Sequence, residues 1–131
     1  MPTAYVDTSV LGRVLLDEPD APAILDELDR FDDIVSSRLL TVELRRLALR
    51  RGFNERATEL LADVLLLPVD EAILAAAEIV TPAAVATLDA IHLVTALRLA
   101  EGGDLDALMT YDARLADAAS HHGLRVLAPR R

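Results

Sequence analysis

The chain of 131 residues contains no cysteine, and only 3% of its residues are aromatic. The absence of cysteine excludes disulfides, zinc–thiolate sites and cysteine nucleophiles. Lysine is also absent, because all 13 basic residues are arginine. No apolar stretch approaches the roughly 20 residues that span a bilayer, so we expect no membrane association. The N-terminus lacks the pattern of a signal peptide, and we therefore expect a cytoplasmic protein.

The composition instead indicates one acidic domain with an aliphatic core. Hydrophobic residues make up 53% of the chain, and its length suits a single core over residues 1–131. The formal net charge of −9 argues against a passive nucleic-acid binder, which is usually basic. It does not exclude a metal-dependent nuclease, because bound cations would offset a cluster of acids.

Strand and helix patterns alternate along the whole chain. Such alternation implies crossover connections, and it predicts an α/β fold with a mainly parallel sheet of four or five strands between helices. Strands are expected at Thr3–Val6, Asp33–Ser36, Leu65–Val69, Leu105–Thr110 and Leu124–Ala128. Within the third of these, Pro68 indicates an edge strand or a strand end. Helices are expected at about Ser9–Leu16, Pro22–Arg30, Ser37–Arg50, Asn54–Val64, Asp70–Val80, Thr87–Ala100 and Ala113–His121. The expected helix caps are Thr8 or Ser9, Ser36 or Ser37, Asn54 and Asp70. The order of the strands cannot be read from this pattern.

Two acids, Asp7 and Asp112, directly follow apolar runs that are predicted to be strands. In open parallel sheets, ligands bind at the carboxyl ends of strands where the strand order reverses. If the two strands are neighbours, both carboxylates lie in one crevice. Helix capping is the alternative for either residue, since Asp is common where a strand leads into a helix.

Two further acids lie on apolar helical faces. Glu43 projects between Leu39 and Leu47 on the helical wheel, which places it on or beside the face that packs on the sheet. A buried acid must be paired or bound to a cation, so an ion pair with Arg46 or Arg50 is the alternative. Asp89 begins an almost wholly apolar helix near its positive N-terminus, and Thr87 is available to cap that helix in its place.

Four carboxylates without a cysteine or histidine at ligand spacing favour a hard cation, Mg²⁺ or Mn²⁺. Ser9 and Thr110 carry hydroxyls beside the acids and could orient a carboxylate. His92 lies one turn after Asp89, and a lone helical histidine more often has a structural role than a ligand role. His121 and His122, at a helix end, are expected to cap the helix or to face solvent.

Three segments resemble the PIN-domain family, specifically the ribonuclease toxins of VapBC-type toxin–antitoxin pairs. These are Tyr5–Leu11, Leu88–Ala96 and Leu108–Leu115, and Glu43 falls where that family has its second acid. The resemblance spans nearly the whole chain, although 51–85 contains no motif.

The resemblance implies a Mg²⁺- or Mn²⁺-dependent endoribonuclease that hydrolyses RNA with a metal-activated water. Asp7 and Asp89 would be the principal metal ligands, and Glu43 and Asp112 would complete the acidic pocket. It also implies a VapB-type antitoxin that blocks the site, and a homodimer. Candidate phosphate contacts are Arg13, Arg45, Arg46 and Arg114, each of which could instead be an ordinary surface arginine.

Other functions fit the pattern less well. A haloacid-dehalogenase-type phosphoryl-transfer domain would need an acid at the position of Ser9 and a lysine, and a receiver domain would need paired acids and a lysine. A non-catalytic module of the same fold that binds RNA or protein is the alternative from another class, although four idle acids would be costly to fold. A PIN nuclease of RNA processing, outside toxin–antitoxin systems, is the third alternative.

Overall fold

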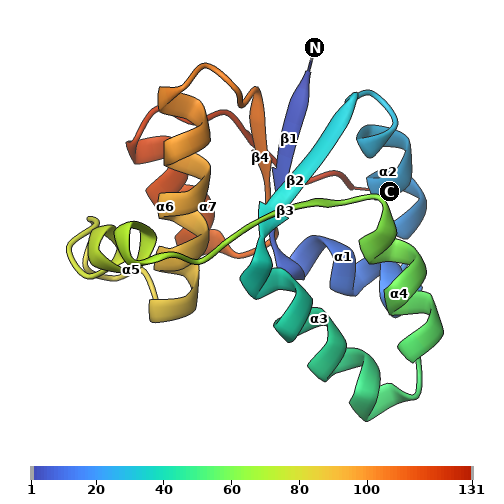
Figure 1. The fold of residues 1–131 in the computed structure, drawn as a ribbon. Coiled ribbons are helices and arrows are strands. Elements are labelled where there is room, and N and C mark those ends of the chain that lie inside the picture. Colours follow the sequence, from blue (N-terminus) through green and yellow to red (C-terminus); the bar gives the residue numbers. More distant parts are fainter. Residues whose placement is uncertain (1, 131) are drawn as a thin grey trace.

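A five-stranded parallel sheet forms the centre of the computed structural model, which describes residues 2–130 (Figure 1). The strand order is β3-β2-β1-β4-β5, and every neighbouring pair is parallel. The strands are β1 (Thr3–Val6), β2 (Asp33–Ser37), β3 (Leu65–Leu67), β4 (Ala107–Met109) and β5 (Val126–Leu127). The expected α/β architecture with a parallel sheet is confirmed.

Helices cover both faces of this sheet (Figure 1). The helices are α1 (Thr8–Leu15), α2 (Ala21–Leu28), α3 (Arg38–Arg51), α4 (Asn54–Ala62), α5 (Glu71–Ala77), α6 (Thr87–Glu101) and α7 (Ala113–His121). Side chains alternate across a strand, so Val6 packs in the core under α1, α3 and α4 while Tyr5 packs under α6 and α7. Within residues 2–130, none of these helices has the length and apolar character that crossing a bilayer requires.

Local sequence signals account for most helix ends. The Ser37 hydroxyl accepts a hydrogen bond from Leu39 N at 3.1 Å and caps α3, and Asp70 caps α5 in the same way. Gly52 ends α3 with a φ of 74°, a left-handed conformation that glycine adopts at little cost. The expected caps at Ser37 and Asp70 are confirmed, and so is the end of α3 at Gly52.

Other expected boundaries were wrong. Helix α1 begins at Thr8, so its N-cap is Asp7 rather than Thr8 or Ser9. Asn54 is the first residue of α4 and Phe53 takes the cap position. Strand β3 ends at Leu67, because Pro68 has no N–H to continue the ladder. Strands β4 and β5 are likewise shorter than the ranges expected for them.

The strand order determines where the site lies. From β1 the chain proceeds outward to β2 and β3, and it then returns to place β4 and β5 on the other side. The order therefore reverses between β1 and β4, whose register pairs Val6 with Met109. The crevice beyond the carboxyl ends of these two strands is where an open parallel sheet binds ligands.

We predict that Ser37→Ala lowers the free energy of unfolding by about 1 kcal/mol, because it removes the cap of α3. Chemical denaturation with urea measures this change. Ser120→Ala, at an exposed position of α7, is the matched control and should change stability by less than about 0.5 kcal/mol. Equal losses of unfolding free energy in the two variants would show that the Ser37 cap does not stabilise this fold.

Candidate active site

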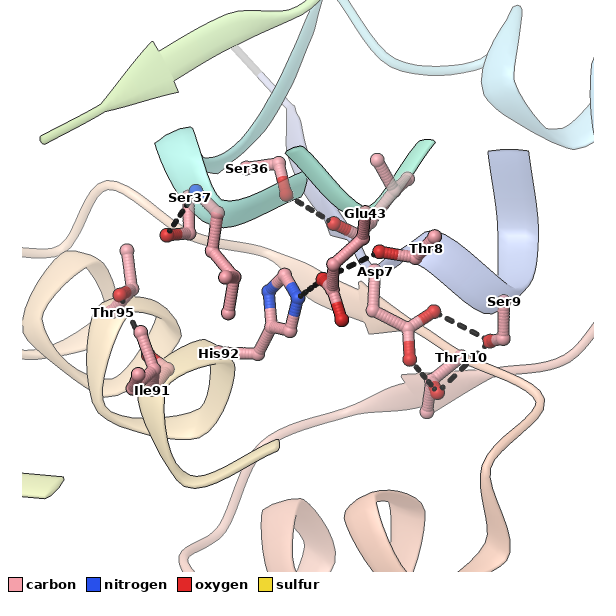
Figure 2. Close-up of polar contacts among 12 residues, drawn as sticks. Asp7, Thr8, Ser9, Ser36, Ser37, Glu43, Ile91, His92, Thr95 and Thr110 are labelled. Carbon is pink, nitrogen blue, oxygen red and sulfur yellow. Dashed lines mark hydrogen bonds and ion pairs between the residues drawn. The ribbon is translucent and has the colours of Figure 1, made fainter. Parts of the chain in front are cut away.

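Asp7 is a buried carboxylate held by two hydroxyl groups. It follows β1, and only 3% of it is exposed. Ser9 Oγ donates to Asp7 Oδ1 at 2.5 Å, and Thr110 Oγ1 donates to Asp7 Oδ2 at 2.6 Å (Figure 2). The side chain makes no capping hydrogen bond to α1, although the residue occupies the N-cap position. Capping therefore does not explain this acid, and Ser9 and Thr110 contact it as expected.

The two hydroxyls are themselves fixed by the backbone of the loop after β4. Ser9 Oγ accepts a hydrogen bond from Tyr111 N at 2.9 Å, and Thr110 Oγ1 accepts one from Asp112 N at 3.1 Å. Each hydroxyl thus receives a backbone N–H and directs its own proton to Asp7. Burial raises the pKa of Asp7, and the hydrogen bonds from Ser9 and Thr110 oppose that rise.

Asp112 has a structural role that the sequence allowed. Its Oδ1 accepts a hydrogen bond from Leu115 N at 3.0 Å and caps α7. One oxygen is therefore used by the helix, whereas the residue as a whole is half-buried at the carboxyl end of β4. The capping alternative applies to Asp112 and does not exclude a role for its second oxygen.

Asp89 is the acid most affected by the others. Its pKa rises from 3.8 to about 6, first because of burial and then because of the negative charges of Asp112, Asp7 and Glu43. Asp89 is thus close enough to the other three predicted site acids for their charges to act on it. The expectation that Thr87 caps α6 was wrong, since Ala86 holds the cap position and makes no side-chain cap.

Glu43 extends from α3 and has 24% of its side chain exposed. Its Oε1 accepts hydrogen bonds from Thr8 Oγ1 at 2.7 Å and from His92 Nε2 at 2.8 Å (Figure 2). Burial alone would raise the pKa of Glu43, but the hydrogen bonds from His92 and Thr8 lower it below its ordinary value. The expected alternative, a pair with Arg46 or Arg50, was wrong: within residues 2–130 the ionisable partner of Glu43 is His92.

His92 and Tyr5 form the buried support behind Glu43. His92 is 1% exposed, and its Nδ1 lies 2.6 Å from the Tyr5 hydroxyl. The two rings meet edge to face, with centroids 5.8 Å apart. Burial raises the pKa of Tyr5 above its ordinary value. The sequence reasoning missed Thr8 and Tyr5 as members of the site, and it missed the contact between His92 and an acid. The only signal was their position within the same segments as Asp7 and Asp89.

The predicted arginines do not neutralise these acids. Arg13 pairs with Asp20 at 3.3 Å and lies 4.1 Å above the Tyr111 ring. Arg45 donates a hydrogen bond to Thr58. Arg46 and Arg114 are exposed. Within the described part of the chain, no arginine lies within ion-pair distance of the four site acids.

The acids nevertheless do not form a ready-made metal cage. Across residues 2–130, no three acidic or histidine side chains are gathered closely enough to hold a metal ion. The donor set consists of carboxylate oxygens, which suit a hard divalent cation. Among the described residues, no arginine offsets the charges that act on Asp89, and a bound cation would relieve that repulsion. The residues therefore fit the cation in chemistry and charge.

We predict that the protein without added metal becomes less stable as pH rises. The pKa of Asp89 is about 6 in the folded chain and about 3.9 when unfolded, so the folded state binds more protons between these values. Stability should fall by about 1 kcal/mol between about pH 5 and about pH 7.5, after allowance for solvent screening of this half-exposed group.

Urea denaturation in EDTA at the two pH values measures this slope. Asp89→Asn should flatten it and should be the more stable protein at the higher pH. Asp117→Asn, on an exposed position of α7, should retain the slope of the unaltered chain. Parallel profiles for Asp89→Asn and the unaltered chain would contradict a cluster of repelling acids.

Comparison with known proteins identifies the family of this chain. The model of the PIN domain family matches residues 4–121. The chain is 40% identical to Ribonuclease VapC46 of Mycobacterium tuberculosis, over 98% of this chain and 99% of that protein. It is 35% identical to Ribonuclease VapC47 of the same species, over 95% of this chain and 96% of that protein.

Two solved structures share the fold at low sequence identity. The crystal structure of Mycobacterium tuberculosis VapC20, described as a Sarcin-Ricin loop cleaving toxin, aligns with a TM-score of 0.68 and 15% identity, covering 96% of this chain and 99% of that one. VapBC2 from Rickettsia felis, bound to a DNA fragment from their promoter, aligns with a TM-score of 0.66 and 12% identity, covering 98% of this chain and 99% of that one. The family model and the near full-length relatives show that the chain belongs to the PIN-domain family, among its VapC members.

Proposed function

We propose that this protein is a divalent-metal-dependent endoribonuclease and the toxin of a VapBC-type pair. The observation that supports the proposal is the buried Asp7 at the end of β1, where the strand order reverses, with both its oxygens held by Ser9 and Thr110. Asp89 is near enough for the charges of Asp112, Asp7 and Glu43 to add to the rise of its pKa. The VapC relatives are named ribonucleases, which supports RNA as the substrate. A cytoplasmic location belongs to this proposal, because RNA and an antitoxin would be encountered there.

Different residues of the chain would hold the cation and orient its ligands. Asp7 and Asp89 would hold the cation, with Glu43 and the second oxygen of Asp112 beside it. A bound Mg²⁺ or Mn²⁺ supplies Lewis-acid polarisation of the scissile phosphate and lowers the pKa of water. The Ser9 and Thr110 hydroxyls keep both Asp7 oxygens in fixed directions. Hydrolysis then adds a water oxygen to phosphorus and releases the 3′-oxygen of the preceding nucleotide.

Partners follow from the same assignment. A VapB-type antitoxin would cover the acidic crevice, and the toxin would form a homodimer. Arg46 and Arg114 are exposed, and within residues 2–130 they make no side-chain contacts of the kind that occupy Arg13 and Arg45. We therefore favour Arg46 and Arg114 among the four predicted arginines for contact with RNA phosphates.

Two alternatives predict different behaviour. A non-catalytic module of this fold would bind RNA without cutting it, with or without a chelator. A PIN nuclease of RNA processing would cut RNA but would have no antitoxin that inhibits it. The resemblance over the full length of VapC relatives favours the toxin.

We predict that the purified chain cuts a total RNA pool at discrete positions with Mg²⁺ or Mn²⁺, and that EDTA abolishes cutting. Asp7→Asn and Asp89→Asn should each lower the cleavage rate at least about 100-fold, because each removes charge from the cation site. Gel analysis of labelled RNA measures the rates, and Asp117→Asn is the matched control. Cutting that persists in EDTA, or in both site variants, would contradict the proposal.

A further inference from the structure

The relay behind Glu43 suggests a role that the proposed function does not assign. Tyr5, on β1, lies beneath His92 of α6, and His92 in turn contacts Glu43 of α3. These residues are far apart in the chain, so the contact joins three separate elements. Asp7 follows the same strand, two residues after Tyr5, and the same helix carries Asp89 one turn before His92.

The hydrogen bonds around Tyr5 agree with one direction for this relay. The Ser37 backbone N–H donates to the Tyr5 hydroxyl at 3.1 Å, so the Tyr5 oxygen is an acceptor there. Its own proton is then available to His92 Nδ1, at 2.6 Å. An imidazole that accepts at Nδ1 carries its proton on Nε2. His92 Nε2 therefore donates to Glu43 Oε1, at 2.8 Å.

The contacts of Glu43 are unequal between its two oxygens. Both donors, Thr8 Oγ1 and His92 Nε2, act on Oε1. Within residues 2–130, no hydrogen bond to Oε2 is formed. Figure 2 shows Glu43 held between His92 on one side and Thr8 on the other. The carboxylate is thereby fixed in orientation while one oxygen is left uncommitted.

We propose that the buried Tyr5–His92 pair is a positioning device for Glu43, which fixes one carboxylate oxygen and presents the other to the cation of the active site. This inference rests on the proposed function, because it assigns a purpose to the free oxygen. His92 acts through Glu43 and touches neither substrate nor cation. Partners of this kind, which orient the groups that bind a metal, commonly change metal affinity by 10–100-fold when they are removed.

Two substitutions of His92 separate positioning from simple core filling. The amide nitrogen of His92→Gln extends about as far as Nε2 and can still donate to Glu43. The shorter side chain of His92→Asn can still meet the Tyr5 hydroxyl but cannot reach Glu43. Both place one polar amide in the same buried space, so a purely structural role predicts similar effects in the two variants.

The first readout is Mn²⁺ binding by the RNA-free protein, measured by calorimetry or by electron paramagnetic resonance. We expect His92→Asn to weaken binding about tenfold and His92→Gln to stay within about threefold of the unaltered chain. The RNA cleavage rate of His92→Asn, relative to the unaltered chain, should be low at limiting Mn²⁺ and should rise at saturating Mn²⁺. Equal Mn²⁺ affinity in both variants would overturn the proposal.

Thr8→Val provides a second route if both His92 variants fail to fold. It removes the other donor to Oε1 from a half-buried position at the start of α1, and it should also weaken Mn²⁺ binding. Thr41→Val is the matched control on α3, because the Thr41 hydroxyl has no hydrogen-bond partner among residues 2–130. Loss of Mn²⁺ affinity in both threonine variants, or in neither, would count against the proposal.

Nuclear magnetic resonance tests the direction of the relay independently. Ring nitrogen shifts of the metal-free protein should show His92 protonated at Nε2 and unprotonated at Nδ1, with the signal identified by its absence in His92→Gln. Protonation at Nδ1 alone would overturn the relay. If the unaltered chain neither binds Mn²⁺ nor cuts RNA, the proposed function fails, whereas normal binding with unaffected His92 and Thr8 variants overturns only the positioning role.

Discussion

The parallel pairing of β1 with β4 is the constraint on which the site depends. Because Val6 lies beside Met109, the chain leaves both strands at the same level. Asp7 and Thr110 are the next residues, and their side chains meet although 103 positions separate them. A buried carboxylate loses its hydration, and two hydroxyl donors at this junction replace part of it. Without this pairing, Asp7 would lose the hydrogen bond from Thr110 and would keep only its local donor Ser9.

Local features of the sequence were sufficient to predict the elements and part of the site. Alternating patterns gave the parallel sheet, and Ser37, Gly52 and Asp70 gave helix ends, because capping involves only neighbours along the chain. The rule that ligands bind at carboxyl strand ends predicted one crevice for Asp7 and Asp112 if their strands were neighbours, and β1 and β4 are neighbours. The strand order could not be predicted, since the contact of β1 with β4 leaves no local pattern in either segment.

The remaining details of the site depend on contacts between distant helices. The helical wheel correctly turned Glu43 toward the interior, but a wheel contains only one helix, so it offered Arg46 and Arg50 as partners. Those arginines are exposed, and the partner is His92 on another helix. Thr87 was wrong as a cap because the extended residue before the helix is Ala86, which leaves Thr87 already within the first turn.

The choice of hydroxyl partners has a consequence for charge. An arginine beside Asp7 would satisfy its oxygens and also cancel its charge, whereas Ser9 and Thr110 donate hydrogen bonds and leave the charge intact. Thr8 likewise donates a hydrogen bond to Glu43 and leaves its charge intact. The acids thus stay available to a cation, and burial together with the charges of Asp112, Asp7 and Glu43 raises the pKa of Asp89. Any cation that binds this crevice in the folded state alone must stabilise the fold by mass action. Relief of the unfavourable charge interactions at Asp89 would therefore add to the stability that a bound cation gives the fold.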